Sequence, residues 1–76
     1  MKRLTVGFIG FGNMAQAMAE GMLQVGALEP DQVYACAGNW DKLCRSAGRY
    51  GIHGCETAEE VAKRSDIVIV AVKPYL

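Results

Sequence analysis

The sequence predicts an α/β fold built on a parallel β-sheet, and three observations support this. Residues 4–9 and 66–72 are apolar stretches without a polar face, which is typical of strands buried on both faces of a sheet. Glycines follow the first stretch at once, and a helical pattern follows the glycines. The expected order is β-α-β-α-β-α-β, which implies right-handed crossovers and helices on both faces of the sheet.

The first helix is expected at residues 13–25, because apolar residues recur there at spacings of three and four. That apolar face consists of Met14, Ala15, Met18, Met22 and Val25. Its methionines are predicted to be core residues. Gly26 is expected to end the helix, because glycine adopts the left-handed conformation at no steric cost. Pro30 and Asp31 predict a loop.

The rest of the chain continues the alternation with shorter elements. The predicted segments are a strand at 33–37, a helix at 41–47 closed near Gly48, a weak strand at 51–55, a helix from Thr57 to about Arg64, and a strand at 66–72. Thr57 and Glu60 match the T-x-x-E capping box that begins a helix. Pro74 is expected to end the last strand, because proline has no N–H to donate to the ladder.

Composition excludes several classes of protein. Half of the residues (51%) are hydrophobic, and eight basic residues balance eight acidic ones, so no nucleic-acid partner is expected. No apolar run approaches the roughly 20 residues that span a bilayer, so no membrane partner is expected either. The three cysteines form no CxxC pair. We therefore predict no disulfide framework, no metal site and a cytoplasmic location.

The glycine-rich turn carries the main functional signal. Residues 10–15 read Gly-Phe-Gly-Asn-Met-Ala and fit the pattern G-x-G-x-x-G/A between a strand and a helix. Gly10 permits the tight turn, Gly12 lets the backbone approach a pyrophosphate, and Ala15 lets the helix pack close to the strand. The helix N-terminus offers free N–H groups to the phosphates. The motif in this context predicts a Rossmann-type, doubly wound domain that binds a dinucleotide.

The end of the second strand indicates which dinucleotide. An NAD site carries an Asp or Glu there, about 20 residues after the glycines, to hold the ribose 2′-OH. Here residues 36–39 read Cys-Ala-Gly-Asn, and the first acid is Asp41. The absence of a carboxylate favours NADP(H), with NAD(H) as the alternative. Lys42 and Arg45 are nearby, but each alone is more typical of a solvated helix face.

Two motifs together resemble those of pyrroline-5-carboxylate reductases. They are residues 7–15, Gly-Phe-Ile-Gly-Phe-Gly-Asn-Met-Ala, and residues 71–74, Ala-Val-Lys-Pro, with Ser65-Asp66 ahead of the second. The first motif alone is shared with 3-hydroxyisobutyrate and 6-phosphogluconate dehydrogenases, whereas the second and its spacing point to the pyrroline family. The resemblance implies transfer of a hydride from NADPH or NADH to the C=N bond of 1-pyrroline-5-carboxylate, which gives L-proline.

The resemblance also implies a set of cofactor-binding positions. Those around the pyrophosphate are Ile9, Gly10, Phe11, Gly12, Asn13 and Met14. Those on the adenosine half are Ala37 and Asn39, near the 2′ position, and Thr57. Those beside the nicotinamide ribose are Ala71, Val72, Lys73 and Pro74. Phe11 stands where the family commonly has a smaller residue, and Thr57 where it often has Asn.

Several of these residues have a plain structural alternative. Asn13 and Thr57 are also suited to capping the helices that they precede. Lys73 is equally typical of a solvated strand end. Trp40 could cover the adenine, but packing on the sheet edge is at least as typical of such a residue. His53 is a lone histidine on a weak strand, for which no catalytic role is expected.

We therefore expect residues 1–76 to be an incomplete N-terminal NAD(P)-binding domain. By the resemblance, a C-terminal helical domain outside these residues binds the substrate and builds a homo-oligomer. No catalytic residue is predicted within the chain for that reason. Two alternatives stay open: a related β-hydroxyacid dehydrogenase, and a non-catalytic nucleotide-binding or redox-sensing module that uses the same fold.

Overall fold

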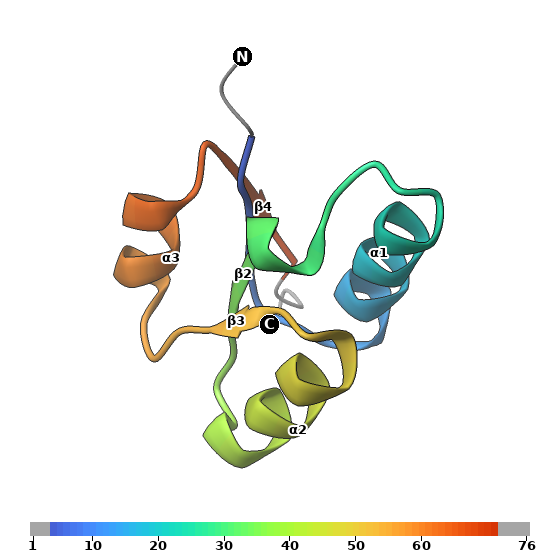
Figure 1. Ribbon diagram of the computed structural model, residues 1–76. Helices are drawn as coiled ribbons and strands as arrows, with labels where there is room; N and C mark the ends of the chain where they lie inside the picture. Colours follow the sequence, from blue (N-terminus) through green and yellow to red (C-terminus); the bar gives the residue numbers. More distant parts are fainter. Residues whose placement is uncertain (1–3, 72–76) are drawn as a thin grey trace.

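Four parallel strands form a single sheet in the order β3-β2-β1-β4 (Figure 1). The computed structural model describes residues 4–71. Its strands are β1 (Val6–Ile9), β2 (Val33–Cys36), β3 (His53–Gly54) and β4 (Ile67–Val70). The chain adds β2 and β3 on one side of β1, then crosses back to place β4 on the other side. This arrangement confirms the predicted parallel α/β fold.

The helices lie on both faces of this sheet. They are α1 (Asn13–Gln24), α2 (Trp40–Tyr50) and α3 (Ala58–Arg64), with a short 3-10 helix, η1 (Pro30–Gln32), before β2. Figure 1 shows α1 and α2 on one side of the strands and α3 on the other. The doubly wound arrangement follows from the chain reversal, because right-handed crossovers in opposite directions place their helices on opposite faces.

Alternation along the strands divides the core into two clusters. Phe8 of β1 and Val33 of β2, both fully buried, face α1 and α2. Cys36 of β2 faces the other way and packs with Val61 of α3. Gly7 also faces α3, and a Cβ atom there would overlap Val61 Cγ1 and the Ser65 side chain. The glycine therefore allows α3 to lie directly against β1.

The buried face of α1 differs from the prediction. Its fully buried residues are Ala15 and Ala19, which are 1% and 0% exposed, whereas Met14 is 76% and Met18 is 41% exposed. Met22 is partly buried against the core. The prediction that Met14 and Met18 are core residues is therefore wrong, because the small residues Ala15 and Ala19 occupy the fully buried positions of α1.

The end of α1 follows the prediction. Gly26 has a φ of 76°, in the left-handed region. Its N–H donates to the Leu23 carbonyl at 3.2 Å, and the Ala27 N–H donates to the Met22 carbonyl at 3.0 Å. These two bonds form a Schellman motif, which satisfies carbonyl groups that the end of a helix leaves without partners.

The end of α2 lies further along the chain than expected. Gly48 lies within the helix, which continues to Tyr50, and Gly51 is the residue with a left-handed φ of 75°. The added turn brings the Tyr50 ring edge-on to the Phe11 ring, with the centroids 6.3 Å apart. The expected stop at Gly48 is therefore wrong, and the aromatic contact helps to stabilise the last turn.

Two shorter segments are defined by side-chain caps. Thr57 Oγ1 accepts a hydrogen bond from the Glu60 N–H at 3.1 Å, so Thr57 begins α3 as predicted. Glu29 and Gln32 form a capping box around η1, where a plain loop was expected. Within residues 4–71, no helix is long and apolar enough to cross a membrane.

Candidate functional site

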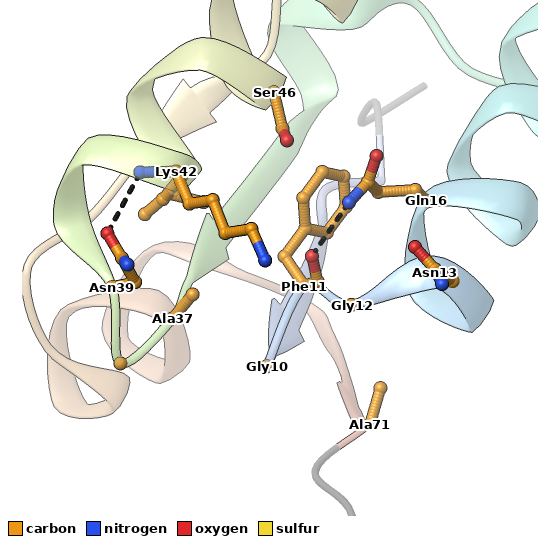
Figure 2. A pocket seen from close by; sticks show the side chains of 12 residues that line it. Gly10, Phe11, Gly12, Asn13, Gln16, Ala37, Asn39, Lys42, Ser46 and Ala71 are labelled. Carbon is orange, nitrogen blue, oxygen red and sulfur yellow. Dashed lines mark hydrogen bonds between the residues drawn. The ribbon is translucent and has the colours of Figure 1, made fainter.

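A cavity of about 600 Å³ opens at the carboxyl ends of β1 and β2 (Figure 2). It lies beside β1, where the chain changes from adding strands on one side to adding β4 on the other. Such a switch point is the usual place for a ligand in an open parallel sheet. Two turns and the residue after β4 supply the lining. The lining residues are Gly10, Phe11, Gly12, Asn13, Gln16, Ala37, Gly38, Asn39, Lys42, Leu43, Ser46 and Ala71.

The glycine turn has the geometry that phosphate binding requires. Gly10 has a φ of 91°, which disfavours any other residue, and its N–H donates to the Cys36 carbonyl at 2.9 Å. Gly12 is the N-cap of α1, and a Cβ atom built there meets nothing within 4 Å. A side chain at Gly12 would therefore occupy the cavity rather than the core. A pyrophosphate fits this cradle, against the free N–H groups of the first turn of α1.

Phe11 lines the cavity while its ring is buried in the core. The side chain is 6% exposed, and its ring centroid lies 5.7 Å from that of Phe8. The bulk of Phe11 therefore adds to the core instead of filling the turn. Its carbonyl accepts a hydrogen bond from Gln16 Nε2 at 3.1 Å, which fixes the orientation of the peptide that follows Phe11. Sequence reasoning missed Gln16, which lies one turn into α1.

The second wall of the cavity comes from the β2–α2 turn. Asn39 caps α2, because its Oδ1 accepts a hydrogen bond from the Lys42 N–H at 3.1 Å. Lys42 and Ser46 follow on one face of the helix, four residues apart, and both line the cavity. Arg45 is not among the lining residues. Lys42 is the single charged side chain among the described residues that line the cavity, so the wall favours an anionic ligand.

The described cavity lining includes seven of the predicted cofactor residues. These are Gly10, Phe11, Gly12, Asn13, Ala37, Asn39 and Ala71. Asn13 is the first residue of α1, whereas Gly12 is its N-cap without a side-chain cap, so the interpretation of Asn13 as a cap is wrong.

Three other predicted residues lie elsewhere. Ile9 packs with Cys36 on the α3 face of the sheet, Met14 points to solvent from α1, and Thr57 lies at the start of α3 beside a shallow depression. Val72, Lys73 and Pro74 lie outside the described residues. Trp40, which is 44% exposed, starts α2 and is not among the residues that line the cavity.

The cysteine and histidine side chains of residues 4–71 are not among the residues that line this cavity. Cys36 and Cys55 are buried on the α3 side, and Cys44 is exposed on α2. Burial raises the pKa of the Cys55 thiol, and the Glu60 carboxylate raises it further, so this thiol stays protonated at neutral pH. The His53 ring stacks on Tyr34, with centroids 4.7 Å apart. Among residues 4–71, no cluster of three or more His, Cys, Asp or Glu residues is arranged to hold a metal ion.

The model of one protein family, described as NADP oxidoreductase, coenzyme F420-dependent, matches residues 5–76. The chain belongs to this family. Membership indicates a nicotinamide dinucleotide as the cofactor, in agreement with the cradle at Gly12 and the cavity beside it.

The chain is also similar to individual pyrroline-5-carboxylate reductases. It is 45% identical over 71 residues to that of Treponema pallidum (strain Nichols), which covers 93% of this chain and 27% of the relative. It is 39% identical over 69 residues to that of Escherichia coli (strain K12), which covers 91% of this chain and 26% of the relative. These similarities confirm the resemblance found in the sequence motifs. The chain spans about a quarter of the length of these relatives.

A solved structure gives the same result for the fold. A pyrroline-5-carboxylate reductase from Coxiella burnetii superimposes with a TM-score of 0.86 at 30% sequence identity, over 96% of this chain and 27% of that one. The parallel sheet, its strand order and the flanking helices are therefore those of a Rossmann-like domain found in that enzyme.

Proposed function

We propose that this chain is the cofactor-binding part of a pyrroline-5-carboxylate reductase. The observation that carries the proposal is the cavity between the glycine turn and α2, in a chain 93% of which aligns with such an enzyme at 45% identity. The complete protein reduces the C=N bond of 1-pyrroline-5-carboxylate to L-proline. When bound, the reduced nicotinamide supplies the hydride for this reaction.

The residues of this chain bind and orient the cofactor. Gly10 and Gly12 shape the turn, and the first N–H groups of α1 hold the pyrophosphate. Ala37 and Asn39 adjoin the adenosine ribose at the end of β2, and Ala71 lies beside the entry to the nicotinamide half. Ile9 and Met14 contribute backbone rather than side-chain surface, because their side chains point away from the cavity.

The cofactor that we propose is NADPH rather than NADH. The described cavity lining contains amide, hydroxyl and ammonium groups but no carboxylate, so a 2′-phosphate enters without repulsion. Thr57 contributes through its cap on α3, and Val72, Lys73 and Pro74 complete the nicotinamide side by analogy with the reductase motif. We further propose a cytoplasmic homo-oligomer whose substrate site and oligomer interface come from a helical domain beyond these residues.

An activity assay on the full-length protein tests the proposal. Absorbance of reduced nicotinamide should fall when pyrroline-5-carboxylate is added to protein and NADPH, and L-proline should accumulate in equal amount. A parallel reaction offers coenzyme F420 in place of the pyrroline, since the family description names that coenzyme. Folded protein that binds NADPH but turns over only with coenzyme F420, or with neither, contradicts the proposed substrate.

A further inference from the structure

Lys42 occupies a distinctive place in the cavity. It is the single charged side chain among the described lining residues, and it comes from α2 rather than from the glycine turn. Figure 2 shows its ammonium group reaching from α2 into the space between Ala37 and the glycine turn. Leu43, which is 2% exposed, anchors the same helical turn in the core. The position of the Lys42 backbone is therefore set by packing beneath it.

Asn39 fixes the first turn of α2 and contributes a second donor. Its Oδ1 accepts a hydrogen bond from the Lys42 N–H at 3.1 Å, and the Nδ2 group of this cavity-lining residue is a second donor. Asp41, between these two residues, is exposed and is not among the lining residues. The β2–α2 turn therefore presents two N–H donors, one of them cationic, to a ligand in the cavity.

We infer that Lys42 selects NADPH over NADH by binding the 2′-phosphate of the adenosine ribose, with the Asn39 amide as the second donor. The inference rests on the proposed function, in which the cavity holds a nicotinamide dinucleotide. The ribose of such a cofactor lies at the end of β2, the wall from which Lys42 and Asn39 project. The pyrophosphate already has the N–H groups at the start of α1. A lysine ammonium is a compact charge suited to a phosphate dianion.

Dissociation constants of NADPH and NADH, measured on the full-length protein, test this inference. Lys42→Met keeps the aliphatic stem and removes the charge, so the dissociation constant of NADPH should rise about tenfold, while that of NADH changes about twofold at most. Arg45→Met removes a cation from the same helix outside the cavity lining and is the matched control; both constants should stay near wild type. The preference of the wild type for NADPH should shrink as salt is added.

Asn39→Asp separates charge from folding. Aspartate caps a helix as well as asparagine, so α2 should keep its stability, which a thermal melt checks. The added carboxylate should weaken NADPH binding much more than NADH binding.

The outcomes distinguish the inference from the function on which it rests. Equal weakening of both cofactors in Lys42→Met places this lysine on the pyrophosphate and overturns the inference, as does an unchanged preference for NADPH. A wild-type protein that binds neither cofactor overturns the proposed function, and the inference with it.

Discussion

Two glycine substitutions should separate cofactor binding from folding. Gly12 has a φ of −80°, which other residues adopt readily, and a Cβ atom there meets nothing within 4 Å. Gly7 has no such space, because its Cβ would overlap Val61 Cγ1 and the Ser65 side chain. Gly12→Val therefore places its side chain in the cavity, whereas Gly7→Ala forces β1 and α3 apart.

The expected magnitudes follow from these contacts. Replacing an N-cap glycine costs less than about 1 kcal/mol, and the reduced freedom of the unfolded chain offsets about 0.4–1 kcal/mol, so Gly12→Val should leave stability almost unchanged. Loss of one hydrogen bond to a charged phosphate costs about 1.5–3 kcal/mol, which is roughly a ten- to hundredfold weaker binding of cofactor. Overpacking at Gly7 should cost about 1–3 kcal/mol of unfolding free energy.

Thermal melts and cofactor titrations on the full-length protein measure both effects. Gly12→Val should melt near the wild-type temperature and bind NADPH and NADH equally poorly, since both contain the pyrophosphate. Gly7→Ala should melt earlier and, while folded, bind both cofactors normally. The reasoning is refuted if Gly12→Val is folded and binds with wild-type affinity, because the turn then does not cradle a phosphate.

Three further predictions concern other parts of the chain. Ala37→Asp should weaken NADPH binding and favour NADH, because a carboxylate beside the 2′ position repels the 2′-phosphate of NADPH and accepts a hydrogen bond from the 2′-OH of NADH. Titrations in which the ratio of the two dissociation constants is unchanged would place the ribose elsewhere. Residues 1–76 alone should show no reductase activity in the NADPH oxidation assay, and measurable turnover would contradict the assignment of the substrate site to another domain. A thiol reagent followed by mass spectrometry should label exposed Cys44 before buried Cys55, whose raised pKa keeps the thiol protonated, and equal labelling rates would contradict the burial. The free energy of unfolding should also fall as alkaline pH passes the ordinary thiol range, because the unfolded chain loses the Cys55 proton first.

Elements with strong local signals could be predicted from the sequence. The order of strands and helices, the left-handed Gly26 and the cap at Thr57 all match, because backbone sterics and a neighbouring side chain decide each of them. The prediction that α2 stops near Gly48 was wrong, because the local signal there is ambiguous. Both Gly48 and Gly51 are suitable helix stops, and contacts beyond the helix, such as that of Tyr50 with Phe11, favour the later one.

The buried face of α1 could not be predicted from periodicity alone. The apolar stripe is wide enough to include both Met14 and Ala15, and hydrophobicity favours the methionine. The close approach of the helix to the sheet decides instead, since only small residues such as Ala15 and Ala19 fit between them.

Both turns of the cavity were predicted from the sequence, whereas three side chains from the neighbouring helices were not assigned to it. The glycine motif identifies the turn, because its residue types are dictated by chain geometry. Gln16, Lys42 and Ser46 lack such a signal, since a polar residue on a helix reads as a solvated surface in the sequence. Only the placement of α2 beside the glycine turn brings Lys42 and Ser46 to the same cavity as Gln16 of α1.

A crystal structure of the full-length protein with NADPH tests the central claim most directly. We expect the pyrophosphate against the N–H groups of Gly12 and Asn13, and the adenosine ribose at Ala37–Asn39 with its 2′-phosphate near the Lys42 ammonium. The account is contradicted if difference density places the dinucleotide outside the cavity between the glycine turn and α2. It is also contradicted if another part of the protein fills that cavity.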